Sequence, residues 1–251
     1  LKYQNGDNST TNNQIKPFLT LFNESNHAIP YNELTVKYWF TPENYSGINT
    51  WIDYAALGNS NVKMSYANLP NPRNNALGYV EYSFLTAAGN LGANANSGVI
   101  QSRFANTDWS DLNEQNDYSW SNSNASILVN TITVYRNGKL IWGKEPTLVP
   151  VNQALKVYAN SKSQPNSNTI STYLKLNNEG TTQIDYKDIK VRYWFTKDGT
   201  ANLNAFFDYV QLGNAKVTGT FGSITNKQGA DSYFDIGFNS TAGVLYPLSN
   251  S

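Results

Sequence analysis

A long internal repeat constrains this chain more than any other feature of its sequence. Residues 34–41 read LTVKYWFT, and residues 189–196 read IKVRYWFT, 155 positions later. Shorter matches farther along keep an offset of 155 or 154, among them Tyr79 with Tyr233. Stacked solenoid repeats have periods of about 20–45 residues, so this much longer period indicates two tandem domains of ordinary size.

The two copies differ in extent. Ser97 aligns with Ser251, so the segment from Gly98 to about Glu145 has no counterpart in the second copy. The prolines that follow predict a short, fairly stiff linker. We expect a complete module over residues 1–146, a linker over residues 147–154 and an incomplete module over residues 155–251. The second module would lack its last strands and expose sheet edges unless another segment covers them.

Short β-strands are the predicted elements of both copies. Runs such as Phe18–Phe22, Thr35–Phe40 and Tyr79–Phe84 alternate in character and contain β-branched or aromatic residues. Clusters of Asn, Gly, Ser and Pro separate these runs, and no stretch has a convincing helical period. The pattern predicts an all-β fold: an antiparallel β-sandwich with jelly-roll topology, in two tandem copies.

Composition excludes several classes of function. The chain has 18 Lys and Arg against 18 Asp and Glu, one His and no Cys. A chain without basic excess is a poor partner for nucleic acid. The absence of Cys removes disulfides and thiolate zinc sites, and one His argues against a His-based metal centre or a serine triad. No apolar run is long enough to span a membrane, and no motif places two carboxyl groups in a cleft, so we do not expect an independent hydrolase.

Four motifs resemble a known family. They are YWFT at 38–41, WIDYA at 51–55, SRFANTDWSDLNEQNDYSW at 102–120 and NGKLIWGKEP at 137–146. Together they make copy one similar to a family 3 carbohydrate-binding module along its whole length, and copy two resembles the N-terminal two thirds of that family. The resemblance implies a nine-stranded jelly-roll sandwich with a structural calcium, and a role in anchoring enzymes or scaffolding proteins to crystalline cellulose.

The compartment follows from the same reasoning. The chain begins LKYQNG, without an initiator Met or a hydrophobic signal segment, so we interpret it as a mature fragment or an excised piece. Absence of Cys is compatible with a secreted bacterial protein. We expect an extracellular, non-catalytic module of a bacterial cellulase, hemicellulase or scaffold, with an attached catalytic or scaffold domain as its partner and plant polysaccharide as its ligand.

The resemblance implies a flat strip of side chains as the carbohydrate-binding site. Trp109 lies in a polar loop and Arg103 alternates with an apolar neighbour, so both are expected to face away from the core. Asp53 has a second interpretation as a residue that stabilises a turn. Tyr66 is the nearest candidate for a further tyrosine. The implied strip residues are Asp53, Tyr54, Arg103 and Trp109, and in the second copy Asp208 and Tyr209 remain.

Calcium is the second feature that the resemblance implies. Hard cations take oxygen ligands from carboxylates, carbonyls and hydroxyls, and the matching positions are Thr41, Glu43, Asn113, Asn116 and Asp117. Alternatively, Asn116 and Asp117 form a turn before a strand. The second copy keeps Thr196 and Asp198 but not the other half of the site, so we predict at most weak calcium binding there.

A third region is a shallow groove on the opposite sheet, which the resemblance implies could receive a linker or a single glycan chain. Its candidates are Lys37, Tyr79, Glu81 and Tyr118, and the alternative is an ordinary solvated sheet face. Two other functions stay open at this point. One is a helper module that packs on a glycoside hydrolase domain or binds single chains without affinity for crystalline cellulose. The other is a sandwich that docks proteins of the cellulosome.

Overall fold

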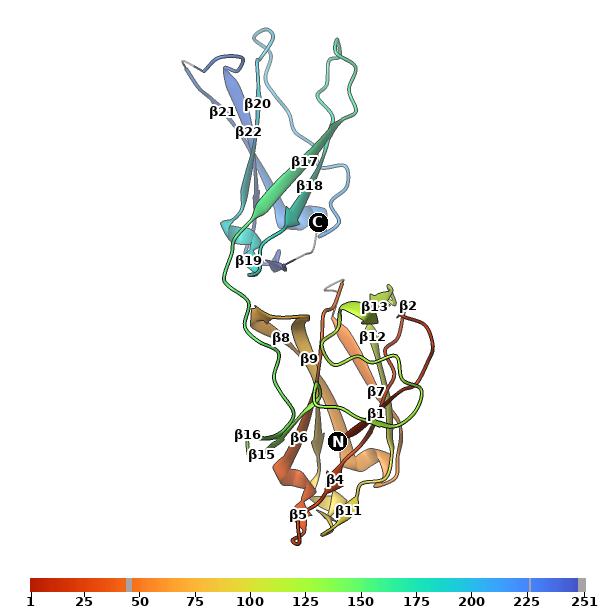
Figure 1. The fold of residues 1–251 in the computed structure, drawn as a ribbon. Helices are drawn as coiled ribbons and strands as arrows, with labels where there is room; N and C mark the ends of the chain where they lie inside the picture. Colours follow the sequence, from red (N-terminus) through yellow and green to blue (C-terminus); the bar gives the residue numbers. More distant parts are fainter. Residues whose placement is uncertain (44–46, 226, 248–251) are drawn as a thin grey trace. The chain divides into compact units, whose positions relative to one another are not determined.

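The computed structural model describes residues 1–43, 47–225 and 227–247. Every regular element in that part of the chain is a β-strand or a single turn of 3₁₀ helix (Figure 1). The chain divides into two compact units, Leu1–Pro150 and Val151–Ser251. Among the described residues, no helix is long and apolar enough to cross a bilayer.

Two five-stranded antiparallel sheets form the first unit. One sheet has the order β14-β1-β3-β12-β7, with β14 (Ile127–Leu128), β1 (Lys2–Asn5), β3 (Pro17–Thr20), β12 (Ile100–Asn106) and β7 (Ile48–Ala55). The other has the order β16-β15-β6-β9-β8, with β16 (Lys139–Trp142), β15 (Thr133–Arg136), β6 (Leu34–Phe40), β9 (Ala76–Phe84) and β8 (Val62–Arg73). Each sheet contains neighbours that are distant in sequence, such as β3 with β12 and β15 with β6, as jelly-roll crossovers require.

Short two-stranded pairs and 3₁₀ turns connect these sheets. The pairs are β13 (Leu112–Asn113) with β2 (Thr11–Asn12), β11 (Ala95–Asn96) with β4 (Phe22–Asn23), and β10 (Asn90–Leu91) with β5 (Ile29–Pro30). The 3₁₀ turns are η1 (Tyr31–Glu33), η2 (Asn59–Asn61), η3 (Thr86–Ala88) and η4 (Glu114–Asn116).

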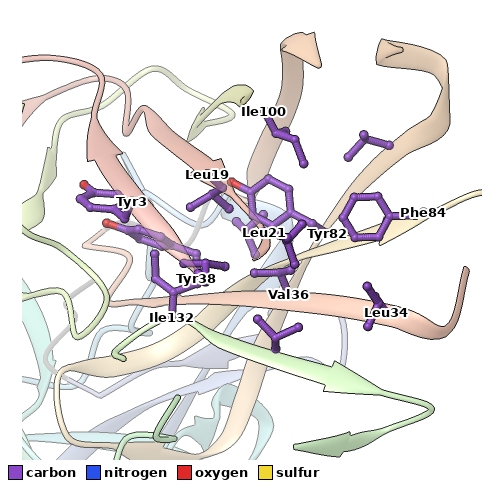
Figure 2. Packing of buried hydrophobic residues seen from close by; sticks show 14 of the residues in the cluster. Tyr3, Leu19, Leu21, Leu34, Val36, Tyr38, Tyr82, Phe84, Ile100 and Ile132 are labelled. Atoms are coloured by element: carbon purple, nitrogen blue, oxygen red, sulfur yellow. The ribbon is translucent and has the colours of Figure 1, made fainter. Parts of the chain in front are cut away.

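The core of the first unit lies between its two sheets and is rich in aromatic rings. Figure 2 shows Tyr3, Tyr38 and Tyr82 among the aliphatic side chains of this core. The Tyr82 hydroxyl lies 2.8 Å from Ser102 Oγ, and Ser102 donates in turn to the carbonyl of Pro17 at 2.7 Å. This chain of hydrogen bonds connects β9 of one sheet to β12 and β3 of the other, so the sandwich is fastened by polar as well as apolar contacts.

Several aromatic rings on the strands of the first unit lie inside the sandwich. Trp39, Phe40, Phe84 and Phe104 are buried. Trp142 packs against the core from a half-buried position and donates Nε1–H to the carbonyl of Val129 at 2.9 Å. The predicted all-β sandwich is therefore confirmed for the first unit, and the aromatic composition of the chain is largely explained by its core.

The second unit contains related but fewer strands. They are β17 (Leu155–Ser161) paired with β18 (Thr172–Asn178), the sheet β20 (Lys190–Phe195), β22 (Ser232–Phe238) and β21 (Val217–Ser223), and β19 (Ile184–Asp185) paired with β23 (Val244–Leu245). Two 3₁₀ turns, η5 (Tyr186–Asp188) and η6 (Asn214–Lys216), complete it. All seven residues of β17 are exposed, whereas β1 of the first unit alternates between half-buried and buried. The described part of this unit holds no counterpart of β12, which in the first unit pairs with β3.

Residues between the two units make hydrogen bonds within one unit or the other. In the first, Leu148 forms a bridge with Arg73, and the amide of Asn74 donates to the carbonyl of Thr147 at 2.8 Å. In the second, the amide of Thr181 donates to the carbonyl of Asn152 at 2.7 Å. Both ends of the segment 147–154 are thus fixed to a folded unit, and the domain boundaries drawn from the sequence stay predictions.

Candidate functional site

A β-bulge shapes the outer face of the pair β7–β12. Gln101 pairs with Tyr54 and Ser102 pairs with Ile52, so Asp53 is the extra residue between two consecutive pairs. A regular strand would turn one of two adjacent side chains inward. Because the bulge removes this alternation, Asp53 and Tyr54 are both exposed, and 48% of Tyr54 is accessible to solvent.

An ion pair lies beside the bulge. Arg103 Nε donates to Asp53 Oδ1 at 3.0 Å. The guanidinium carbon of Arg103 lies 4.5 Å from the ring centroid of Trp51, directly across the strand pair. A planar, delocalised guanidinium stacks on an aromatic face in a way that a lysine ammonium cannot. The side chain of Asp53 therefore contacts Arg103, while Asn59 holds the local backbone by donating to the carbonyl of Asp53 at 3.1 Å.

Trp109 stands on a hydrogen-bonded loop after β12. Its φ of 60° lies in the left-handed region, which is uncommon for residues other than glycine. Its amide donates to the carbonyl of Asn106 at 3.0 Å, and both the amide and the hydroxyl of Ser110 donate to Asp108 Oδ1. The loop leaves 45% of Trp109 exposed, so the ring is not a core residue.

Trp51 is a residue of this face that the sequence reasoning missed. Its ring stacks on that of Trp109, with centroids 5.6 Å apart and 20° between the planes. A signal was present in the strand period: Trp51 lies two positions before Asp53, and residues i and i+2 share a face of a strand. The structure thus brings Asp53, Arg103, Trp51 and Trp109 into one connected set of contacts, with Tyr54 beside Asp53.

The two candidate residues of the second copy lie outside any strand. Asp208 and Tyr209 follow an irregular segment, and 82% of Tyr209 is exposed. Phe206 occupies the position that matches Trp51, and 83% of it is exposed. In the first unit the equivalent segment is β7, which pairs with β12, whereas in the second copy Asp208 and Tyr209 are in no strand of the described structure.

Tyr66 lies away from this face. It belongs to β8 in the other sheet, where its ring packs 5.6 Å from that of Phe40 and its hydroxyl donates to Asn68 Oδ1. It is half-buried and contacts the core. The position of Tyr66 therefore gives no support to it as the candidate for a further tyrosine, because its ring packs against the core.

The residues implied as calcium ligands come together at one end of the first unit. Asp117 Oδ1 accepts a hydrogen bond from the amide of Thr41 at 2.7 Å, and the side-chain amide of Asn116 donates to Glu43 Oε1 at 3.0 Å. Asn113 caps η4, accepting from the amide of Gln115 at 3.2 Å. The two halves of the predicted site, 41–43 and 113–117, are therefore neighbours, although about 70 residues separate them in sequence.

These groups suit a cation with oxygen ligands. Burial raises the pKa of the Asp117 carboxyl well above its ordinary value, and the charge of Glu43 raises it further. Burial also raises the pKa of Glu43. Among the described residues, Asp117 Oδ2 and Asn116 Oδ1 are buried without a hydrogen-bond partner. Unpaired buried oxygens and adjacent carboxyls are costly, and a bound divalent cation would relieve both costs.

Carboxylates alone do not make this site. No group of three or more His, Cys, Asp or Glu side chains in the described ranges lies close enough to hold a metal. The set is instead two carboxyls supplemented by hydroxyl, amide and carbonyl oxygens, which is within the range that calcium accepts. Glu114, which the sequence reasoning did not single out, lies inside the same turn with both carboxyl oxygens buried and without hydrogen-bond partners in the described structure.

The second copy lacks this arrangement in its described residues. The hydroxyl of Thr196 donates to the carbonyl of Gly229 at 3.3 Å, and Asp231 accepts from the amide of Lys197 at 2.8 Å. No segment matching 113–117 lies beside them in the part of the chain that the structure describes. Weak calcium binding there stays a prediction.

Three of the four groove residues lie together on the second sheet. Lys37 and Glu81 are a cross-strand pair on β6 and β9, with Lys37 Nζ 3.6 Å from Glu81 Oε2 and 4.0 Å from the ring centroid of Tyr79. Tyr118 instead donates its hydroxyl to the carbonyl of Lys144 at 3.2 Å. On this face the ammonium of Lys37 is paired with Glu81 and lies close to the ring of Tyr79. Tyr118 is instead hydrogen-bonded to the segment that ends the first unit.

The end of the first unit is fastened near this face. Glu145 accepts from the Tyr135 hydroxyl at 2.7 Å and from Arg73 Nη1 at 2.8 Å. Lys37 Nζ lies 5.1 Å from the ring centroid of Tyr135. The segment that closes the module is thus anchored by Tyr135 and Arg73, and Tyr135 in turn lies close to Lys37 of the predicted groove.

Comparison with known families gives this geometry a context. The sequence matches the cellulose binding domain family (CBM_3) in two regions, residues 1–143 and 156–251. The chain belongs to this family. The tandem copies predicted from the internal repeat are therefore two CBM_3 modules, and the resemblance on which the sequence interpretation depends is confirmed.

Several proteins of known sequence are similar to this one. The beta-mannanase/endoglucanase A of Caldicellulosiruptor saccharolyticus is 32% identical, and the match covers 98% of this chain but 22% of that protein. The cellulosomal-scaffolding protein A of Acetivibrio thermocellus is 34% identical over 61% of this chain and 9% of its own length. The chain thus spans about a fifth or less of these two relatives.

Solved CBM_3 structures resemble the fold. A CBM3 module of Hungateiclostridium clariflavum is 40% identical, with a TM-score of 0.55, and covers 58% of this chain and 97% of its own. The family 3a carbohydrate-binding module of the cipA scaffolding of Clostridium thermocellum is 34% identical, with a TM-score of 0.52, and covers 57% of this chain and 97% of its own. Carbohydrate binding is the function that family membership supports.

Proposed function

We propose that the first unit binds the flat face of crystalline cellulose through Tyr54, Trp109 and the Asp53–Arg103 pair. The observation that carries this proposal is that the exposed rings of Tyr54, on β7, and Trp109, just after β12, flank the Asp53–Arg103 ion pair, where the bulge at Asp53 presents two adjacent side chains to solvent. A pleated sheet fixes the spacing of such side chains before the ligand arrives, which lowers the ordering cost of binding.

The chemistry of the ligand matches this face. Crystalline cellulose presents glucose rings with C–H groups pointing outward, and aromatic faces pack against such surfaces. Each ring that buries about 100 Å² of apolar surface contributes on the order of 2 kcal/mol. Three such contacts sum to about 6 kcal/mol of favourable free energy, from which the cost of association is subtracted, so loss of any one of them should weaken binding measurably. The zero formal net charge of the chain suits a ligand that is itself uncharged.

The role that follows is non-catalytic targeting. The relatives named above include a beta-mannanase/endoglucanase and a cellulosomal-scaffolding protein, each much longer than this chain. We therefore propose that the module is secreted and that it holds an attached catalytic or scaffold domain on plant cell-wall polysaccharide. The second copy, whose Asp208 and Tyr209 lie outside any strand of the described structure, contributes less to this binding.

Calcium has a structural role in this proposal. Thr41, Glu43 and Asp117 would supply side-chain oxygens, and Asn113 and Asn116 would supply carbonyls. The cation would join the chain after β6 to the segment around η4. This segment follows the loop that leaves β12 and carries Trp109. Its contribution is to the rigidity of the first unit, because these ligands lie in two segments that are distant in sequence.

A binding measurement on solid cellulose tests the proposal. The intact chain is mixed with microcrystalline cellulose, and depletion from the supernatant is measured for the parent and for the double variant Tyr54→Ala/Trp109→Ala. The matched control is Phe22→Ala, an exposed ring on β4 that is outside the strip. We expect the parent and the control to bind and the double variant to stay in solution. Equal retention of all three would contradict the strip.

A second measurement, retention in an affinity gel, distinguishes the proposed strip from the helper-module alternative. A module that binds single glycan chains, through the face of Lys37 and Tyr79, would be retained by soluble oligosaccharides in an affinity gel and would ignore the crystalline solid. Loss of gel retention in Tyr79→Ala, with no depletion by crystalline cellulose in the parent, would favour that alternative over the strip.

A further inference from the structure

Trp51 contacts two members of the proposed strip at the same time. The Arg103 guanidinium carbon lies 4.5 Å from its ring centroid, and the Trp109 ring stacks on it at 5.6 Å. We propose that Trp51 is a positioning residue: it sets the orientation of Arg103 and Trp109 and thereby the flatness of the strip. This inference rests on the proposed function for its consequence in binding, but the positioning itself can be tested without cellulose.

The strand pair fixes Trp51 itself. Arg103 and Trp51 are directly opposite in the register of β12 and β7, so their backbones are held at the spacing of a cross-strand pair. Apart from this contact, the described interactions of the Arg103 side chain comprise its pair with Asp53. A single hydrogen bond leaves the plane of a guanidinium free to rotate, and a ring face against it removes that freedom.

Trp109 depends on the same ring for its orientation. The hydrogen bonds of its loop involve the backbone and the neighbours Asn106, Asp108 and Ser110, so they fix where the Trp109 backbone lies. The direction of the indole about its side-chain torsions is decided by what the ring touches. The stack on Trp51, with 20° between the planes, is the ring contact that the structure gives it.

Trp51 is separate from the core of the first unit. It is half-buried, and it is not among the partly buried side chains that pack against that core in the described structure. In the first unit its contacts come from the strip, which is the pattern expected of a support for exposed side chains rather than of a core residue.

A double-mutant cycle on cellulose tests how Trp51 acts. If Trp51 positions Trp109 and Arg103, Trp51→Leu weakens association about five- to tenfold in the parent and less than twofold in a Trp109→Ala/Arg103→Ala background. Combined with Tyr54→Ala, which is not in contact with Trp51, the loss should be additive. Trp51→Phe keeps a ring for stacking and should recover most of the affinity. If the effect of Trp51→Leu on association is fully additive with the effects of Trp109→Ala and Arg103→Ala, Trp51 contacts cellulose directly, and the proposal is overturned.

A spectroscopic arm is independent of cellulose binding. The chain has six Trp, and with 5-fluorotryptophan the ¹⁹F signal of Trp109 is assigned by its loss in Trp109→Phe. We expect this signal to shift and narrow in Trp51→Leu as the ring is released, and to return towards the parent position in Trp51→Phe. An unchanged Trp109 signal in a folded Trp51→Leu variant refutes the positioning role. Failure of the parent to bind cellulose would instead refute the proposed function, and the ¹⁹F result would still decide the role of Trp51.

Discussion

The size of the Trp109 contribution to binding can be worked out from its exposure. A tryptophan side chain presents up to ~250 Å², and 45% of Trp109 is exposed, which leaves about 110 Å² for a ligand. If between half and all of that area is covered at ~25 cal/mol per Å², Trp109→Ala loses about 1.4 to 2.8 kcal/mol. The association constant for crystalline cellulose should therefore fall about ten- to hundredfold.

The assay is a depletion isotherm on microcrystalline cellulose, from which affinity and capacity are fitted separately. The capacity should stay constant, because the same number of lattice sites is available, while the affinity falls. Phe22→Ala is the matched control, since 38% of that ring is exposed on a different face, and it should stay within about twofold of the parent. The reasoning would be refuted by a Trp109→Ala variant that has the same thermal unfolding temperature as the parent and an affinity for cellulose within twofold of the parent value.

Three further predictions follow from the same structure. Arg103→Lys keeps the charge beside Asp53 but removes the planar group that stacks on Trp51, so affinity should fall about threefold to tenfold in the depletion assay; parent-like binding would mean that charge alone matters. Chelating calcium should lower the thermal transition of the first unit by about 5 °C and leave that of the second unit unchanged, while Asp117→Ala abolishes the response; identical calorimetric scans with and without chelator would contradict a calcium site. The hydrogen bond from Tyr135, followed by the charge of Arg73, lowers the pKa of Glu145 from its ordinary 4.5, so its stabilising contribution is present above that value and is lost as the pH falls through the lowered pKa. The amide of Asn74, which donates to Thr147, should lose protection from hydrogen exchange, relative to the intrinsic rate at each pH, in that acidic range, and Glu145→Gln should remove this pH dependence.

Much of the fold could be predicted because the repeat and the strand period are local properties. The all-β sandwich in two copies follows from short alternating runs, and it is confirmed. The run Phe18–Phe22 shows the limit: it divides into β3 and β4 at Leu21, whose amide donates to Ser97 Oγ at 3.0 Å. Ser97 is 76 residues away in sequence, so no local pattern predicts this hydrogen bond or the break in the strand.

The candidate site was predictable in its composition but not in its contacts. Resemblance to the family supplied Asp53, Tyr54, Arg103 and Trp109, and these stay predictions as binding residues. The bulge at Asp53 and the stack of Trp51 depend on the register between β7 and β12, and a shift of one residue would have turned every side chain over. Register is set by pairing between distant segments, so the role of Trp51 became visible only in three dimensions.

The position of β12 has a consequence for mechanical load. A module anchored to a solid takes the drag of whatever it carries, and that force enters through the side chains that grip the solid. Arg103 lies on β12, which is hydrogen-bonded to β3 on one side and β7 on the other. Ser102, its neighbour, is joined across the sandwich to Tyr82. Traction on the strip would therefore be shared by both sheets, instead of peeling a single edge strand from the module.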